Sequence, residues 1–144
     1  MNAFLLSVHV LAAIVFIGPV TVATSLFPRY AREGNVAVVH ALHRISRVYA
    51  VLGVSVPAFG LALASSMGVL GDAWLVASIL LTAGAAALLA LVVLPGQVRA
   101  VAALDAEGSV TVAPRLAMAS GVFALTWAVV VVLMIVRPGS TTGV

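Results

Sequence analysis

The sequence predicts an all-α, polytopic membrane protein: a bundle of four transmembrane helices in a single domain. Of its 144 residues, 64% are hydrophobic and 8% are charged, whereas a soluble domain carries charge on about a quarter of its residues. The apolar residues lie in four long runs with short polar links, and one helical crossing needs about 20 apolar residues. We therefore expect a multi-pass integral membrane protein.

The first span is predicted over residues 2–27 and is apolar on all sides, as expected of a helix that faces lipid. Gly18-Pro19 interrupts its second half, and a kink is expected there because proline removes a backbone donor. Phe27-Pro28 is expected to end the span. The apolar run is too long for a signal peptide and no basic segment precedes it, so we expect it to be retained as a mature span.

The second span is predicted over residues 36–67, and Pro57, four residues after Gly53, predicts a second kink. Gly60 and Ala64 have the spacing that lets a neighbouring helix approach closely. The first turns of this helix carry a basic stripe, whose members follow each other at i, i+3, i+4 and i+7: His40, His43, Arg44 and Arg47.

The third and fourth spans are predicted over residues 74–94 and 115–136. Pro95-Gly96 is expected to end the third helix, and the weak helical period after it predicts a short surface helix in the link. Pro114 is expected at the first position of the fourth helix.

The arginines predict the orientation. Six of the seven lie in or beside the links between helices 1 and 2 and between helices 3 and 4. The positive-inside rule places both links in the cytoplasm and both termini outside, in the plasma (inner) membrane. Arginines beside apolar spans reflect topology, so no nucleic-acid partner is expected. Each of these links combines a preceding proline, arginine and Glu-Gly, which raises the hypothesis of an internal repeat.

His9 is the only histidine inside a predicted span, about 10 Å along the helix from its outer end. An ionisable residue at that depth is a functional candidate by default. A neutral imidazole can bind haem iron or copper, or pass a proton. The alternative is a structural histidine, bonded across the bundle to a carbonyl or to a serine: Ser7, Ser65 or Ser66.

Met67 and Met134 are candidates for a second cofactor ligand near the outer ends of helices 2 and 4. Thioethers bind the iron of haem b and Cu(I), so a site with His9 is one hypothesis. Both methionines are nearer the surface than His9, however, and methionine in an apolar helix commonly fills space.

The basic stripe has two interpretations. His40 and His43 share a helix face and suit a metal ion, but the neighbouring arginines repel a divalent cation. We expect the stripe to contact the lipid bilayer through anionic headgroups on the cytoplasmic side, at about 1 kcal/mol per charge. A phosphate-bearing ligand is the alternative.

Several activities are not indicated. The chain has no cysteine, which excludes disulfides and thiolate sites. No acid lies within a predicted span, which argues against a proton-coupled transporter. Phosphate loops, zinc-protease motifs and nucleophile elbows are absent from the sequence, so an enzyme is not expected.

The run Ser7-Val8-His9 through Phe16-Ile17-Gly18 resembles the opening helix of a bacterial family of predicted integral membrane proteins of unknown function. A similar first helix occurs in copper-resistance D-type membrane proteins and in HemJ-type protoporphyrinogen oxidases. The resemblance implies a four-helix architecture and, for His9, a link to metal or haem. The tryptophan and second glycine usual in the family are Phe16 and Pro19 here.

Two functions are therefore predicted. The first is a non-catalytic helical subunit or accessory protein of a larger membrane assembly, which forms homo- or hetero-oligomers through small-residue helix faces such as Ala117 and Gly121. The second is a haem- or copper-binding redox or metal-handling protein that uses His9.

Overall fold

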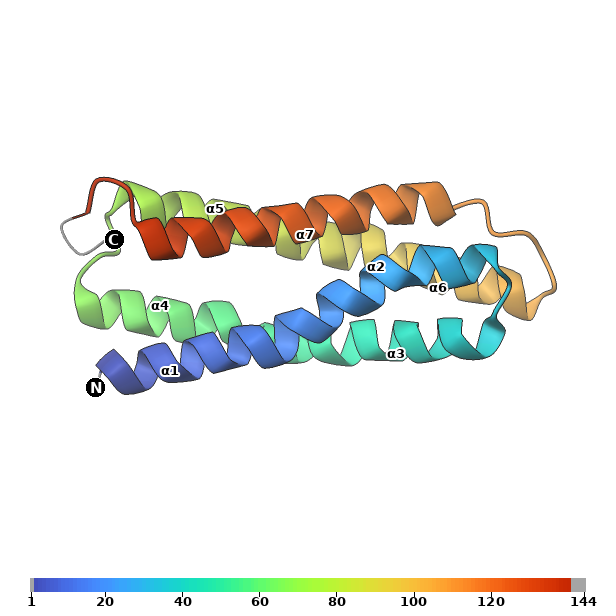
Figure 1. Cartoon of the computed structure of the whole chain (residues 1–144), viewed down its shortest axis with the longest axis horizontal. Helices are drawn as coiled ribbons and strands as arrows, with labels where there is room; N and C mark the ends of the chain where they lie inside the picture. Colours follow the sequence, from blue (N-terminus) through green and yellow to red (C-terminus); the bar gives the residue numbers. More distant parts are fainter. Residues whose placement is uncertain (1, 141–144) are drawn as a thin grey trace.

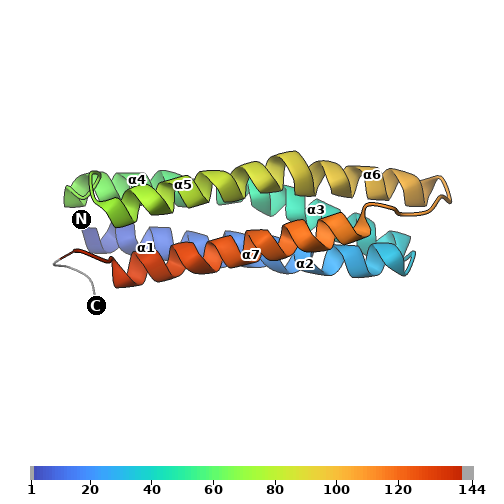
Figure 2. The same ribbon diagram turned by 90° about the horizontal axis from the view of Figure 1, so that it is seen from above.

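The computed structural model describes residues 2–140, which form four long helices in an antiparallel bundle with no strand in that range (Figure 1). All four are long and apolar enough to cross a membrane: Asn2–Arg32, Val36–Met67, Ala73–Asp105 and Ala113–Val136. The predicted fold class is confirmed. The start of α1 and the end of α7 lie at one end of the bundle, here called the terminal end. The links 33–35 and 106–112 lie at the other, here called the arginine-rich end (Figures 1 and 2).

The first long helix consists of α1 (Asn2–Ala12), the π-helical turn η1 (Ala13–Ile17) and α2 (Gly18–Arg32). The interruption predicted at Gly18-Pro19 is confirmed, and the wide π turn that precedes the proline provides it. The predicted end at Pro28 is wrong. The carbonyl of Thr24, which Pro28 deprives of its helical donor, instead lies 2.9 Å from the Ser120 hydroxyl of the fourth helix, which shares its proton between Thr24 and the Leu116 carbonyl at 2.7 Å. Because the freed group has this partner, the helix continues to Arg32.

The second long helix consists of α3 (Val36–Gly53) and α4 (Ser55–Met67). Asn35 caps its start by accepting a hydrogen bond from the Val38 amide. The break at Val54, three residues before Pro57, confirms the predicted interruption. Gly68 ends the helix with a left-handed backbone conformation, φ 71°, which glycine adopts without strain.

The third long helix consists of α5 (Ala73–Leu88), the π turn η2 (Leu89–Val93) and α6 (Leu94–Asp105). The prediction that Pro95-Gly96 ends it is wrong, and the predicted surface helix is its continuation. In η2 the Leu94 amide donates to the carbonyl of Leu89, five residues earlier, and this wider turn accommodates the proline ring. Helices 1 and 3 thus share a π turn followed by proline, a likeness that pairs Pro95 with Pro19.

The fourth helix, α7 (Ala113–Val136), is continuous and ends at Arg137 in a left-handed conformation. It packs against α2 and α5, while α3 packs against α2 and α6. Toward the terminal end the bundle divides into two pairs, α1 with α4 and α5 with α7 (Figure 1). A small cluster of Ala64, Trp74 and Leu75 connects these pairs near the tip.

Two larger apolar clusters form the core of the remaining bundle. The central cluster contains buried side chains of the first, third and fourth long helices: Val20, Ala85, Leu89, Val93, Ala119 and Phe123. The second long helix contributes the half-buried Tyr49 and Ala50. The other stabilises the arginine-rich end with Phe27, Ala31, Val39, Ala100 and Leu116. The helix extensions beyond Pro28 and Pro95 are therefore held by their own packed core.

Candidate functional site

His9 is buried between α1 and α4, with 8% of its surface exposed. Its Nδ1 lies 2.9 Å from the backbone oxygen of Val56 on α4. Because a carbonyl only accepts, Nδ1 is the donor in this bond, and in the neutral imidazole the lone pair is then on Nε2. This geometry agrees with the structural interpretation of a bond to a carbonyl across the bundle. Two of the three candidate serines have other partners: Ser7 bonds within its own helix, and Ser66 bonds Asn2 and its own helix.

Gly60 allows this close approach of α1 and α4. A Cβ added at Gly60 would lie 2.8 Å from Cε1 of His9 and 3.2 Å from its Nδ1. The imidazole therefore occupies the space that any other residue at position 60 would need. The predicted function of Gly60 as a contact point for a neighbouring helix is confirmed, and the neighbour belongs to the same chain.

The two methionines proposed as second ligands for His9 lie near the terminal end of the bundle, at the end of α4 and in the last turn of α7. Met67 lies seven residues beyond Gly60 on α4, about 10 Å along the helix axis. Met134 packs on the cluster of Ala64, Trp74 and Leu75. Within residues 2–140 no three His, Cys, Asp or Glu side chains are grouped so as to hold a metal ion.

The histidines of the basic stripe have partners on α6. His40 and His43 face the third helix: Nε2 of His40 lies 2.8 Å from Oδ1 of Asp105, and Nδ1 of His43 lies 2.9 Å from Oε1 of Gln97. Arg44 and Arg47 lie on the exposed surface of α3. All four residues line one open groove along α3, and α6, which extends past Pro95, supplies partners for both histidines.

Gln97 is a site residue that the sequence analysis missed. It is the sole glutamine in the chain and is fully buried. Its Nε2 donates to the Ser46 hydroxyl at 3.3 Å, while its Oε1 accepts from Nδ1 of His43. A helix that ended at Pro95 would place Gln97 in a solvated link, whereas Gln97 belongs to α6. In the sequence, the polar Gln97 stands next to apolar residues with a helical period, and this pattern could have indicated a buried side chain on a continuing helix.

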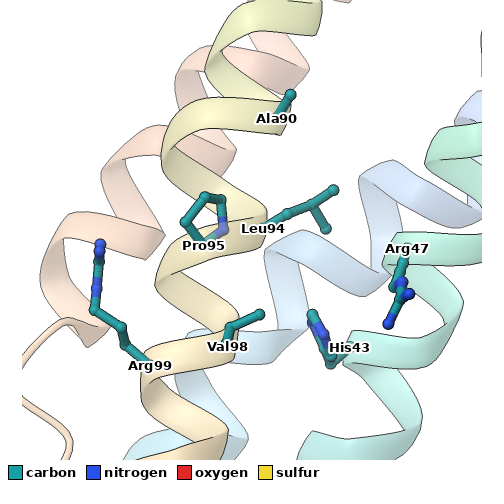
Figure 3. Close-up of a pocket in the computed structure, with 7 residues that line it drawn as sticks. All are labelled: His43, Arg47, Ala90, Leu94, Pro95, Val98 and Arg99. Atoms are coloured by element: carbon teal, nitrogen blue, oxygen red, sulfur yellow. The ribbon is translucent and has the colours of Figure 1, made fainter.

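A shallow groove lies where α3 faces η2 and α6 (Figure 3). In Figure 3, Leu94 and Val98 point from α6 toward His43 and Arg47 on α3, and Arg99 lies on the other side of α6. We call this the basic groove. Its volume is about 540 Å³, and its lining residues are His43, Arg47, Ala90, Leu94, Pro95, Val98 and Arg99. A second open groove along α3 shares His43 and Arg47 with it.

The arginines of the basic groove carry uncompensated charge. Across the described part of the chain, the ion pairs are Arg29 with Glu33, at 3.2 Å, and His40 with Asp105. Neither Arg47 nor Arg99 has a carboxylate partner there. The groove thus combines an apolar wall with positive charge that no neighbouring acid of residues 2–140 neutralises.

The glycines of the long helices fall into two groups. A Cβ added to Gly53, Gly60 or Gly96 would meet a side chain of another helix, at 3.1, 2.8 and 2.5 Å respectively. At Gly18, Gly84 and Gly121 a Cβ would meet nothing within 4 Å, and all three residues are exposed. The first group serves packing within the chain, whereas the second lies on its outer surface.

Comparisons of this chain with protein-family models, with curated proteins and with solved structures find no match. The family resemblance of the first helix therefore stays a prediction.

Proposed function

We propose that this chain is a membrane-embedded, non-catalytic helical subunit or accessory protein of a larger membrane assembly. The observation that supports this proposal is the outward position of Gly84 on α5 and Gly121 on α7, with no neighbouring side chain of their own chain. The contact surface would be the faces of α5 and α7 that carry them. Its partners are helices of another copy or of another membrane protein.

Small residues on an outer helix surface have a specific use in a membrane. Glycine inside a helix costs about 1 kcal/mol relative to alanine, and contact with lipid tails does not require it. Small side chains let two helix backbones approach closely, and van der Waals packing then stabilises the contact. Ala83 and Ala87 are exposed around Gly84, and Ala117 is exposed one turn before Gly121. The predicted pair of Ala117 and Gly121 is thus available to a partner helix.

We also propose an orientation of the chain in the membrane. Six arginines belong to helix segments at the arginine-rich end: Arg29, Arg32, Arg44, Arg47, Arg99 and Arg115. The positive-inside rule supports a cytoplasmic location for that end in the plasma membrane, with the termini outside.

The proposal is tested by replacing the outward glycines with leucine. Gly84→Leu and Gly121→Leu add bulk where the chain itself has room, so the monomer should keep its helix content by circular dichroism. The size of the native assembly, measured after mild detergent extraction and by energy transfer between labelled copies in vesicles, should fall to that of the monomer. Ala62→Leu, on an exposed position of α4, is the matched control and should leave the assembly unchanged. A wild-type chain that is monomeric in both measurements refutes the proposal.

One observation favours the second function, a haem- or copper-binding protein. The bond from Nδ1 of His9 to the Val56 carbonyl holds the ring in the tautomer with a free Nε2, as found in histidines that bind metals. The test is the visible spectrum and metal content of the purified protein. A Soret band or bound copper that disappears in His9→Ala supports this function, whereas a colourless and metal-free protein refutes it.

A further inference from the structure

We propose that the basic groove binds an anionic phospholipid of the leaflet at the arginine-rich end. Arg47 would bind the phosphate from α3, Arg99 would add positive charge from the other side of α6, and the first part of an acyl chain would lie on Leu94, Pro95 and Val98. This binding site is independent of the proposed subunit role, because it uses α3 and α6 and not the outward faces of α5 and α7.

The position of the groove along the helices matches the headgroup level. After Arg47 the second helix has no charged residue up to its end at Met67. Those 20 residues, Val48 to Met67, extend about 30 Å, the thickness of the hydrocarbon core. Arg47 thus marks the boundary between hydrocarbon and headgroups. Ala90 and Leu94 line the groove from Arg99 toward the middle of the third helix, where an acyl chain would lie.

The charge of the groove complements a phosphate. Its arginines have no carboxylate partner within residues 2–140, and the nearby Asp105 is engaged by His40 at 2.8 Å. A guanidinium group binds phosphate oxygens through parallel N–H bonds and loses little hydration when it does so. In Figure 3, Arg47 and Arg99 flank the wall of Leu94, Pro95 and Val98. An amphiphile with a charged head and an apolar tail fits this combination better than a fully soluble anion.

The buried amide of Gln97 positions the third polar group of the groove. Gln97 is fully buried, accepts from Nδ1 of His43 and is anchored to Ser46. The imidazole is therefore held against α6, and Nε2 is its remaining polar atom.

The experiment uses the purified full-length chain in a neutral detergent, with lipid adducts counted by native mass spectrometry. The probes are phosphatidylglycerol, phosphatidylcholine and inorganic phosphate. Phosphatidylglycerol should bind more tightly than phosphatidylcholine, and millimolar inorganic phosphate should not displace it. Arg47→Gln and Arg99→Gln should each weaken phosphatidylglycerol binding about fivefold, and about 25-fold together. Arg115→Gln, an exposed arginine outside the groove, is the charge-matched control and should change binding less than twofold.

Each alternative outcome overturns the proposal. Equal binding of the two lipids would mean that the groove does not recognise charge. An equal loss in the Arg115→Gln variant would mean that the whole arginine belt attracts lipid without a site. Displacement by inorganic phosphate would identify a soluble phosphate as the ligand. Val98→Gln tests the apolar wall separately from the arginines. Val98 is exposed, so the change should leave the fold intact and still weaken lipid binding.

Discussion

Replacing Gly60 by alanine tests the contact between α1 and α4 most directly. The new methyl group would lie 2.8 Å from Cε1 of His9, which is closer than two carbon atoms can pack. The imidazole cannot simply turn away, because it is buried and its Nδ1 is bonded to the Val56 carbonyl. Either this hydrogen bond breaks or the two helices separate.

The size of the effect follows from three contributions. Loss of the hydrogen bond costs about 1 kcal/mol, and overpacking in a close-packed contact costs about 2 kcal/mol. The higher helix propensity of alanine offsets about 1 kcal/mol of this. Gly60→Ala should therefore lower the free energy of unfolding by about 2 kcal/mol.

A double-mutant cycle isolates the contact. In a His9→Ala background the clash and the bond are both gone, so Gly60→Ala should stabilise the protein by about 1 kcal/mol through helix propensity alone. The coupling energy between the two positions should then be about 3 kcal/mol. The assay is reversible unfolding in mixed micelles with increasing dodecyl sulfate, followed by circular dichroism.

Gly84→Ala is the control for this cycle, since its Cβ meets nothing within 4 Å. It should be neutral or stabilising in both backgrounds. If Gly60→Ala has the same effect with and without His9, to within about 0.5 kcal/mol, the two residues are not in contact and the described geometry of this site is wrong.

Three further predictions concern other parts of the chain. Gly96→Ala places a methyl group 2.5 Å from Cδ2 of the buried Leu116 and should destabilise the bundle by about 1–3 kcal/mol in the same unfolding assay; an unchanged midpoint would contradict the packing of the third and fourth helices. Asn35→Ala removes the acceptor of the Val38 amide and should cost about 1 kcal/mol, with Asn35→Ser retaining most of the stability. A topology reporter inserted at Gly71 should report the external side, and one inserted at Asn35 the cytoplasmic side; the opposite pattern would invert the proposed orientation.

Composition and hydropathy were sufficient to predict the architecture. Four apolar runs of spanning length leave few alternatives to four helices, since backbone groups in hydrocarbon must be satisfied within the segment. The interruptions near Pro19 and Pro57 were also predictable, because proline always removes a donor at a known place. Such features depend on local chemistry that the sequence displays directly.

The helix ends at Pro28 and Pro95 were mispredicted for a different reason. Whether proline ends a helix depends on what happens to the carbonyl that it leaves free. At Pro28 the Ser120 hydroxyl, 96 residues away from Thr24, satisfies that carbonyl. No local pattern indicates a partner so distant in sequence. The missed role of Gln97 followed from the same error.

The number of helices, their apolar character and the end of the bundle that carries the arginines can all be predicted from the order of the residues. The face that each residue of those helices presents depends on the packing of the four helices against one another. Gly60 and Gly121 look alike in sequence, each one turn from an alanine, yet one lies against His9 and the other lies on the open surface. Helices that are apolar on all sides have no amphipathic pattern to mark an inner face, so the contacts between helices alone make that distinction.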